Sequence, residues 1–351
     1  MKKILASLIA SSTLLTSLVA CGNTPQLTPS AAMLSGRAPI QMQAANGPRA
    51  FGAQASNNKL KIATYNIRNL FDGLPNAMQN EALVASGEQA ERAKPEKELI
   101  ALGESFHDIN ADVVALQEVE NISVLTQFRD KYLSDMGYKE VVLVEGNDQR
   151  GIDVALLSRY PVSNVKSHKD ARFPVPGQGT QGFSRDLLQL RVNGPNNYKF
   201  TVFVAHLKSH HGDGPADIKR QAEAEKAREI IAAFQQANPG ENVVVMGDLN
   251  DPHTSQFLAP LVNPQVSGLG MHDVIAEELG VQDWVYTYHP QKYRSRIDYV
   301  MMNKNMIKEY QPKSVKLYKP SKQGNDWQRL YFYNASDHIP VTVELDVSQD
   351  R

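Results

Sequence analysis

The chain has 351 residues, of which 42% are hydrophobic and 21% are charged. These proportions are typical of a soluble globular protein, and they exclude a disordered chain, a collagen-like repeat and a polytopic membrane protein. The single cysteine excludes an intrachain disulfide and any zinc site built from cysteines.

The net charge of −1 conceals an asymmetry between two parts of the chain. Residues 1–58 contain four basic residues and no acidic one, which leaves 33 basic and 38 acidic residues in 59–351, a net charge of −5. The near-neutral balance argues against a protein that coats nucleic acid, because such a protein would be basic. If the body handles a polyanion, a bound divalent cation and a local basic rim must attract it.

The first 20 residues have the pattern of an export signal. Lys2 and Lys3 form a positive start, and the apolar run 4–20 ends in small residues. The sequence Leu-Val-Ala-Cys-Gly over 18–22 resembles the lipobox of bacterial lipoproteins, in which the signal is removed before an acylated cysteine. We therefore expect a lipoprotein signal over 1–20 and lipid attachment at Cys21; a plain secretory signal and a retained membrane span are the alternatives.

Residues 21–58 follow as an expected flexible tether. Beyond Cys21 they are rich in Gly, Pro, Ala, Gln, Asn and Ser, show no usable periodicity and contain no acidic residue. The remaining residues, 59–351, are expected to form the catalytic domain.

Short apolar runs recur along that domain and are typical of strands, several of them alternating with period two. They lie at 60–67, 112–119, 140–145, 152–158, 186–192, 199–206, 242–247, 297–302 and 340–345. Helices are predicted over 91–109, over 121–136 with Asn121 as N-cap and Gly137 as stop, and over 215–237. Some connections are too short for a helix, so antiparallel pairing is expected. The predicted fold class is α/β (α+β): two packed mixed β-sheets flanked by helices in a four-layer sandwich.

Polar residues of types that bind metal ions or transfer protons lie at the ends of these runs. A polar side chain at the end of an apolar strand projects at the sheet edge where ligands bind, although a single one is more often a turn residue. The group comprises Asn66, Glu118, His206, Asp248, Asn250, Asp298 and His338. Carboxylates and amide oxygens without cysteine suit Mg²⁺, Mn²⁺ or Ca²⁺, and histidines beside carboxylates suit acid–base catalysis. Together they indicate metal-assisted attack of water on a phosphate ester.

Eight motifs in order resemble those of the endonuclease/exonuclease/phosphatase superfamily, of the deoxyribonuclease I-like type, over nearly all of 59–346. They are IATYNIRNLF, LQEVE, GIDVALLSRYP, FSRDL, AHLKS, GDLND, RSRIDYV and SDHIPVTVEL. The resemblance implies that Glu118 is the principal metal ligand, with Asn66 beside it and Asp337 as a further contact. For Asn66, a strand-ending turn is the alternative.

The same resemblance assigns catalytic roles. His338 would be the general base that activates water, with Asp298 holding its imidazole. His206 would contact the scissile phosphate or protonate the leaving oxygen, and Asp153 would be its carboxylate partner unless it is only a polar residue in a hairpin. Asp248 and Asn250 would orient the nucleophile and grip the phosphate.

Arg185 is the implied phosphate clamp, because guanidinium suits phosphate, with a surface ion pair as the alternative. Lys208 is also placed for a phosphate. Two further stretches of sequence each suit more than one role. The loop containing His210, His211 and Asp213 suits a second metal, a substrate contact or a merely solvated loop. The aromatic and basic residues over 284–296 suit base stacking, a packed hairpin or insertion into lipid.

The leading functional hypothesis is a divalent-metal-dependent phosphodiesterase, a surface-anchored nuclease that degrades DNA or RNA. We expect it to be exported, bound to a bacterial membrane or cell surface through Cys21, and monomeric. The alternatives are a phospholipid phosphodiesterase of the sphingomyelinase kind, a phosphomonoesterase of the same superfamily, and a catalytically inactive surface-binding protein.

Overall fold

The computed structural model describes residues 58–73, 93–210, 213–283, 285–290, 294–319, 321–323, 326–328 and 334–348. The expected signal, Cys21 and all of the tether except Asn58 lie outside these residues, as do His211 and Trp284. Within the described part of the chain, no helix combines the length and the apolar character needed to cross a membrane.

The first sheet has six strands and mixed pairing. Its order is β13 (Lys316–Leu317), β16 (Val341–Asp346), β1 (Lys59–Leu70), β2 (Val113–Val119), β4 (Asp153–Ser158) and β3 (Glu140–Leu143). β1 and β2 run parallel, whereas β16 pairs antiparallel with β1 and β4 pairs antiparallel with β2. The first and the last long strands of the domain are therefore neighbours.

The second sheet also has six strands. Its order is β11 (Met271–Asp273), β12 (Asp298–Asn303), β10 (Asn242–Asp248), β9 (Lys199–His206), β8 (Leu187–Asn193) and β5 (Val162–Ser167). β9 and β10 are parallel, and the other pairs are antiparallel. Each sheet thus contains one parallel pair near its centre.

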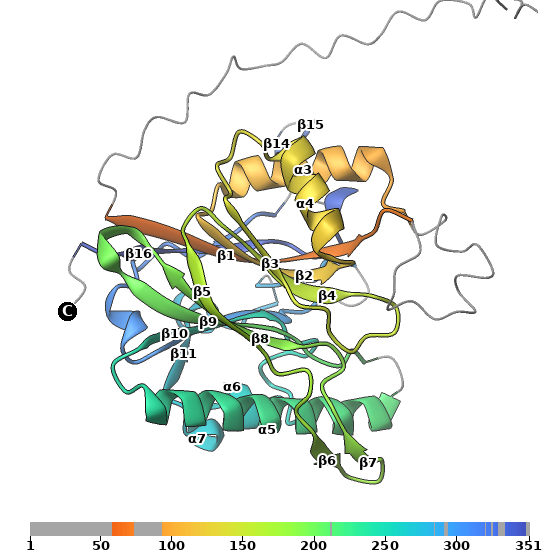
Figure 1. Ribbon diagram of the computed structural model, residues 1–351, viewed down its shortest axis with the longest axis vertical. Coiled ribbons are helices and arrows are strands. Elements are labelled where there is room, and N and C mark those ends of the chain that lie inside the picture. The colour runs from red at the N-terminus through yellow and green to blue at the C-terminus, as the bar shows by residue number, and fades with distance from the viewer. Residues whose placement is uncertain are drawn as a thin grey trace, which may run out of the picture. The chain divides into compact units, whose positions relative to one another are not determined.

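Helices cover the outer faces of the two packed sheets (Figure 1). α3 (Glu96–Ile109) and α4 (Ile122–Tyr132) lie on the first sheet, and α5 (Asp213–Ala237) lies on the second. The expected four-layer sandwich is confirmed. The smaller elements are α6 (Ala259–Val262), α7 (Pro264–Ser267), α8 (Val274–Leu279), the hairpin β6 (Phe173–Val175) and β7 (Gly179–Gln181), the hairpin β14 (Ser321–Gln323) and β15 (Asp326–Gln328), and the 3₁₀ turns Pro195–Asn197 and Met306–Lys308.

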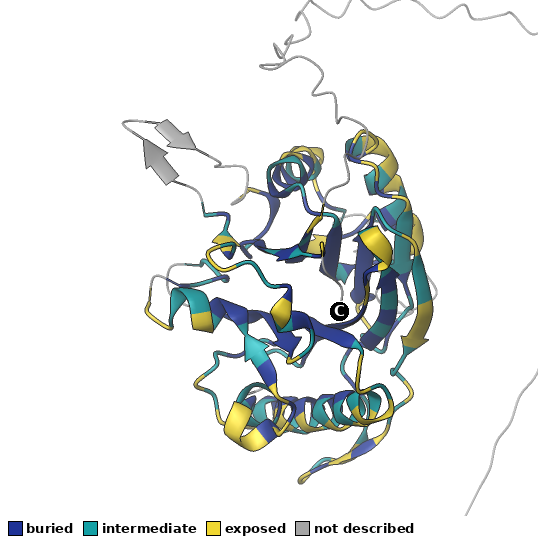
Figure 2. Ribbon diagram, turned by 90° about the vertical axis from the view of Figure 1, so that its left-hand side faces the viewer, coloured by how far each residue is buried: buried dark blue, intermediate teal, exposed yellow. Residues whose placement is uncertain are grey.

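Alternation along the central strands accounts for the layers. Ile62 of β1 and Val244 of β10 point into the core between the sheets, while their neighbours Ala63 and Val245 pack against the helices of their own sheets. Successive side chains of a strand point to opposite faces, so a strand buried on both faces reads as continuously apolar. Figure 2 shows that the strands of both sheets are mostly buried and that the helices expose their outer sides.

The predicted helices differ from the observed ones mainly at their ends. Asn121 is the N-cap of α4, as predicted, and its Oδ1 accepts a hydrogen bond from Val124 N at 2.9 Å. The helix ends at Tyr132 rather than at 136, and Gly137 takes a φ of +74° in the turn that follows. α3 begins at Glu96, directly after Pro95, because proline lacks the amide hydrogen that a helix interior requires.

Candidate active site

Three adjacent strands of the second sheet bring three predicted residues side by side. His206 ends β9, Asp248 ends β10 and Asp298 begins β12; Asp248 is the register partner of both others. The alignment depends on Gly247, where a Cβ would lie 1.9 Å from Ala205 O. Only glycine allows β10 to approach β9 this closely, which explains a glycine inside a strand.

The first sheet supplies the opposite wall. Asn66 of β1 donates from Nδ2 to Glu118 Oε1 at 3.2 Å and to Asp248 Oδ2 at 3.0 Å, so it links the two sheets. The loop before β16 is fixed to the same strand, because Ser336 Oγ donates to Asn66 O at 2.7 Å. His338 N in turn donates to Ser336 Oγ at 3.0 Å. The imidazole of His338 is thereby placed against the second sheet.

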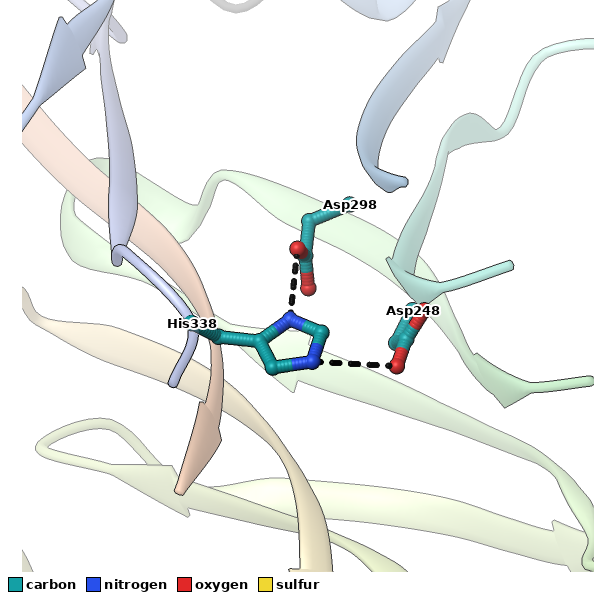
Figure 3. A group of neighbouring side chains, drawn as sticks. All are labelled: Asp248, Asp298 and His338. Atoms are coloured by element: carbon teal, nitrogen blue, oxygen red, sulfur yellow. Dashed lines mark hydrogen bonds and ion pairs between the residues drawn. The ribbon is translucent and has the colours of Figure 1, made fainter. Parts of the chain in front are cut away.

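The imidazole of His338 lies between two carboxylates (Figure 3). Its Nδ1 is 2.8 Å from Asp298 Oδ2, and its Nε2 is 3.7 Å from Asp248 Oδ2. Burial alone lowers the pKa of His338, but the charges of Asp298 and Asp248 and the hydrogen bond to Asp298 outweigh it and raise the pKa to about 10. Burial also raises the pKa of Asp248, against the effect of His338. His338 is therefore oriented by Asp298 and is a stronger base than free imidazole.

His206 is buried and lies on the other side of Asp248. Its Nε2 is 3.5 Å from Asp248 Oδ2, and its Nδ1 has no hydrogen-bond partner among the described residues. Burial, followed by the charges of Arg185 and His338, lowers the pKa of His206 well below the usual value. The pKa values of the two histidines that flank Asp248 are thus shifted in opposite directions, with His338 favouring the protonated form and His206 the neutral form.

The expected pairing of Asp153 with His206 is not formed. Asp153 Oδ1 accepts a hydrogen bond from Gly146 N at 2.7 Å, which turns its carboxylate into the loop before β4. Asp153 begins β4 in the first sheet, whereas His206 ends β9 in the second. Burial raises the pKa of Asp153 to about 7, opposed by the Gly146 hydrogen bond. Asp153 therefore supports a loop, and the carboxylate beside His206 is that of Asp248, which lies 3.5 Å from Nε2.

Asp153→Asn is expected to raise the melting temperature at pH 8 and to change it little near pH 4. The folded-state pKa lies above the unfolded one, so the carboxyl costs stability progressively as pH rises from about 4 to about 7. Asparagine keeps the acceptor for Gly146 N and removes this cost. Thermal melts of both proteins at the two pH values measure the effect, and an equal change at both would contradict it. Phosphodiester hydrolysis should be retained.

A cleft of about 720 Å³ opens above these strand ends. Among the predicted residues, those that line it are Glu118, Arg185, His206, Asp248, Asn250, Asp337 and His338. Asn250, with a φ of +58°, donates from Nδ2 to Leu207 O at 3.0 Å. Asn66 and Asp298 lie behind this wall and hold its residues in place. Arg68 and Asn69 also line the cleft. Both have a φ of +49°, and this kink in the backbone turns them toward the cleft. Their sequence pattern did not indicate the kink.

The donors in the cleft fit a hard divalent cation. Glu118 and Asp337 are half-buried carboxylates at its surface, and oxygen ligands of this kind suit Mg²⁺, Mn²⁺ or Ca²⁺. Glu118 has a φ of +65°, a costly conformation for this residue that active sites often retain. Asn66, expected beside it as a ligand, is fully buried and instead orients the Glu118 carboxylate through Nδ2. Glu118 and Asp337 thus offer carboxylate oxygens to an ion in the cleft, and Asp248, Asp298 and His338 form a second, buried group whose ligand atoms lie within 4.8 Å of one another.

The two expected phosphate-binding cations lie in different places. Arg185 is buried and lines the cleft; its Nε is 3.0 Å from Asp148 Oδ2, and its Nη1 donates to Leu207 O at 2.9 Å. Its ion pair is therefore buried, not at the surface. Lys208 is not among the residues that line this cleft and faces a neighbouring one. The FSRDL and AHLKS motifs thus contribute to two adjoining spaces.

The structure also shows where the loop containing His210 and the described residues of the aromatic segment 284–296 lie. His210 lies 3.0 Å from Asp251 Oδ1 through Nε2 and 3.2 Å from Asp217 Oδ1 through Nδ1, so ion pairs anchor this part of the loop. In the second stretch, Tyr288 pairs with Ser295 as a hairpin does, and its ring lies 5.1 Å from that of His338. The aromatic segment therefore borders the cleft and contacts the candidate base.

Comparison with known proteins agrees with this geometry. The model of the Endonuclease/Exonuclease/phosphatase family matches residues 61–311. The chain belongs to this family of phosphoric ester hydrolases. The resemblance seen in the eight motifs is confirmed. No curated protein sequence is similar enough to count as a relative.

Solved structures share the fold at low sequence identity. The catalytic domain of human Nocturnin, with bound sulfate anion, is 14% identical, with a TM-score of 0.53 over 82% of this chain and 94% of that one. A family protein from Bacteroides thetaiotaomicron is 19% identical, with a TM-score of 0.51 over 82% and 97%. The mannosyl-6-phosphatase Bt3783 of the same organism is 15% identical, with a TM-score of 0.50 over 82% and 99%.

Proposed function

We propose that this protein is a divalent-metal-dependent phosphodiesterase that hydrolyses nucleic acid. The observation that carries the proposal is the His338 imidazole, held at Nδ1 by Asp298, in one cleft with Glu118 and Asp248. A carboxylate that fixes an imidazole in this way sets its tautomer and favours proton transfer at the other nitrogen.

The residues divide the chemistry between them. His338 takes the proton of the attacking water at Nε2, and Asp248 and Asn250 orient that water and the phosphate. His206 donates a hydrogen bond to the phosphate or a proton to the leaving oxygen. A divalent cation held by Glu118 and Asp337 would neutralise negative charge on the phosphate oxygens and favour the neutral, proton-accepting form of His338. No covalent enzyme intermediate is required.

Cations around the cleft support a nucleic-acid substrate. Arg68, Arg150, Arg185 and Arg294 line it, although the body as a whole carries a net charge of −5. Such a local field attracts a phosphate backbone where bulk charge does not. We further propose that the protein acts outside the cell as a monomer, bound to the membrane through lipid at Cys21.

The test is the incubation of purified protein with plasmid DNA and with RNA, in the presence of Mg²⁺ and in EDTA. We expect strand cleavage with Mg²⁺ and none in EDTA. A parallel panel of sphingomyelin, inositol phosphates and sugar phosphates completes the test. Faster turnover of any of these than of nucleic acid would replace the proposed substrate, and cleavage unaffected by EDTA would refute the metal requirement.

A further inference from the structure

A second cleft, of about 800 Å³, adjoins the first and is called the side cleft here. It lies beside the start of β6, the end of β7 and the first half of α5, the region at the foot of Figure 1. The charged residues among those described that line it are Arg150, Arg172, Arg185, Lys208, Lys219 and Asp148. Five cations thus face one carboxylate.

Two described acids, Asp148 and Glu223, lie beside these cations. Asp148 is shared between two cations, because Arg150 contacts it through Nε at 3.0 Å and Nη2 at 2.9 Å while Arg185 Nε lies at 3.0 Å. Glu223 is buried, and its oxygens accept the backbone amides of Ser184 and Lys208 at 2.7 Å. Asp148 is thus shared between two guanidinium groups, and Glu223 is engaged by two backbone amides.

The cations also crowd one another. Burial, then the nearby charge of Arg185, lowers the pKa of Lys208, while Glu223 opposes this. Lys219 Nζ lies 4.0 Å from Glu223 Oε1, at the limit of an ion pair. A bound anion would relieve this repulsion, and guanidinium groups match phosphate in bidentate geometry.

The position of Arg172 is set by its surroundings. Its Nη1 donates to Lys169 O at 3.1 Å and to Ala171 O at 3.3 Å. Asn147 Nδ2 donates to Lys169 O at 2.8 Å and to Phe183 O at 3.1 Å, which ties the two loops together. At Gly182 a Cβ would lie 2.5 Å from Arg172 Nη1, so glycine leaves room for the guanidinium. Arg172, an exposed residue, thus reaches the side cleft from a loop that Asn147 ties to its neighbour.

The side cleft continues into the catalytic one, since Arg150, Arg185 and Ser209 line both. We propose that the side cleft binds the phosphate next to the scissile one in a nucleic-acid strand. The inference rests on the proposed function, and it makes Arg172 and Lys219 residues that select substrates with more than one phosphate. A strand carries a charge at every nucleotide, so one phosphate in the catalytic cleft brings its neighbour to the side cleft.

The test compares a single-stranded oligonucleotide with bis(p-nitrophenyl) phosphate, a diester with one phosphate. The variant is Arg172→Gln with Lys219→Gln. We expect the KM for the oligonucleotide to rise about tenfold with kcat nearly unchanged, because the lost interaction is uniform binding. The salt dependence of its KM should weaken by about 0.7 in log–log slope, since the contact with one phosphate of a single strand is lost. Kinetics on the one-phosphate diester should not change.

Lys226→Gln is the matched control, because it removes the same charge from the same helix outside the side cleft, where Lys226 pairs with Glu229. Gly182→Ala is a second variant that displaces Arg172 without removing charge, and it should also raise the KM for the oligonucleotide. Melting temperatures verify that the variants fold. An unchanged oligonucleotide KM in the folded double variant, or an equal rise for both substrates, would overturn the proposal.

Binding of a labelled oligonucleotide in EDTA, followed by fluorescence anisotropy, separates the two proposals. If the protein hydrolyses only the one-phosphate diester but binds the oligonucleotide through Arg172 and Lys219, the nuclease function fails and the side cleft stands. If the oligonucleotide is cleaved but substitution of both residues does not change its binding, the proposed function stands and the proposed role of the side cleft is wrong. If the oligonucleotide neither binds nor reacts, both fail.

Discussion

His338→Ala is expected to lower kcat for phosphodiester hydrolysis by about 10²–10⁴-fold, the usual contribution of a general base. Asp298→Asn should cost a similar factor, because the amide cannot hold the imidazole at Nδ1 as the carboxylate does at 2.8 Å. The double variant should be little worse than either single variant, since the two groups act as one unit. Initial rates with bis(p-nitrophenyl) phosphate at saturating Mg²⁺ measure all three.

His107→Ala is the control for these substitutions. His107 lies in α3, is paired with Asp135 on the surface at 3.0 Å and does not line the cleft, so its removal should leave the rate unchanged. Melting temperatures distinguish a loss of chemistry from a loss of folding. If His338→Ala folds and retains the full rate, His338 is not the base and the catalytic assignment fails. Additive losses in the double variant would contradict a single His338–Asp298 unit.

Glu118→Gln is expected to lower activity by about 10²–10³-fold at a fixed Mg²⁺ concentration. The Glu118 carboxylate accepts hydrogen bonds from Asn66 Nδ2 and Asn69 N. An amide in its place has no negative charge, and its NH₂ group would face one of these two N–H donors. The Mg²⁺ concentration that gives half-maximal activity should rise by at least about tenfold. Titration of activity with Mg²⁺ and Mn²⁺ measures the shift.

Glu229→Gln is the matched control, because Glu229 is an exposed acid on α5 whose partner is Lys226. It should leave the metal titration unchanged. Removal of the metal by dialysis against EDTA should abolish hydrolysis by the unaltered protein, and added Mg²⁺ should restore it. A Glu118→Gln protein with the same metal titration as the parent would show that the cation is held elsewhere.

Most of the fold could be predicted because its strands are long and apolar. The predicted runs at 199–206 and 242–247 correspond to β9 and β10, whose side chains are buried on both faces. β5, β11 and β13 were missed since they lie at sheet edges, where short length and exposed side chains remove the hydrophobic pattern. The hairpin of β6 and β7 has three residues in each strand, too few to show a period.

The candidate site could be predicted where a residue ends a strand, as His206 and Asp248 do. The role of Asp153 could not, because the direction of its side chain is set by Gly146, which lies seven residues earlier in a loop. Two cations of the side cleft, Arg172 and Lys219, could not be predicted for a related reason, whereas Arg185 and Lys208 were expected to bind phosphate. Arg172 and Lys219 come from a loop and a helix that meet only in the folded protein, and no local pattern connects them.

The pairing of β1 with β16 has a consequence for when the enzyme becomes active. Lys59 lies opposite Asp346, so the strand that opens the domain is completed by the strand that closes it. Contacts of such sequence separation form late and slowly in folding. His338 lies just before β16, so a chain in synthesis contains Glu118 and Asp248 before it acquires the proposed base. A chain cut between Asp298 and His338 would therefore lack the base that we propose, together with the strand β16 that completes the first sheet.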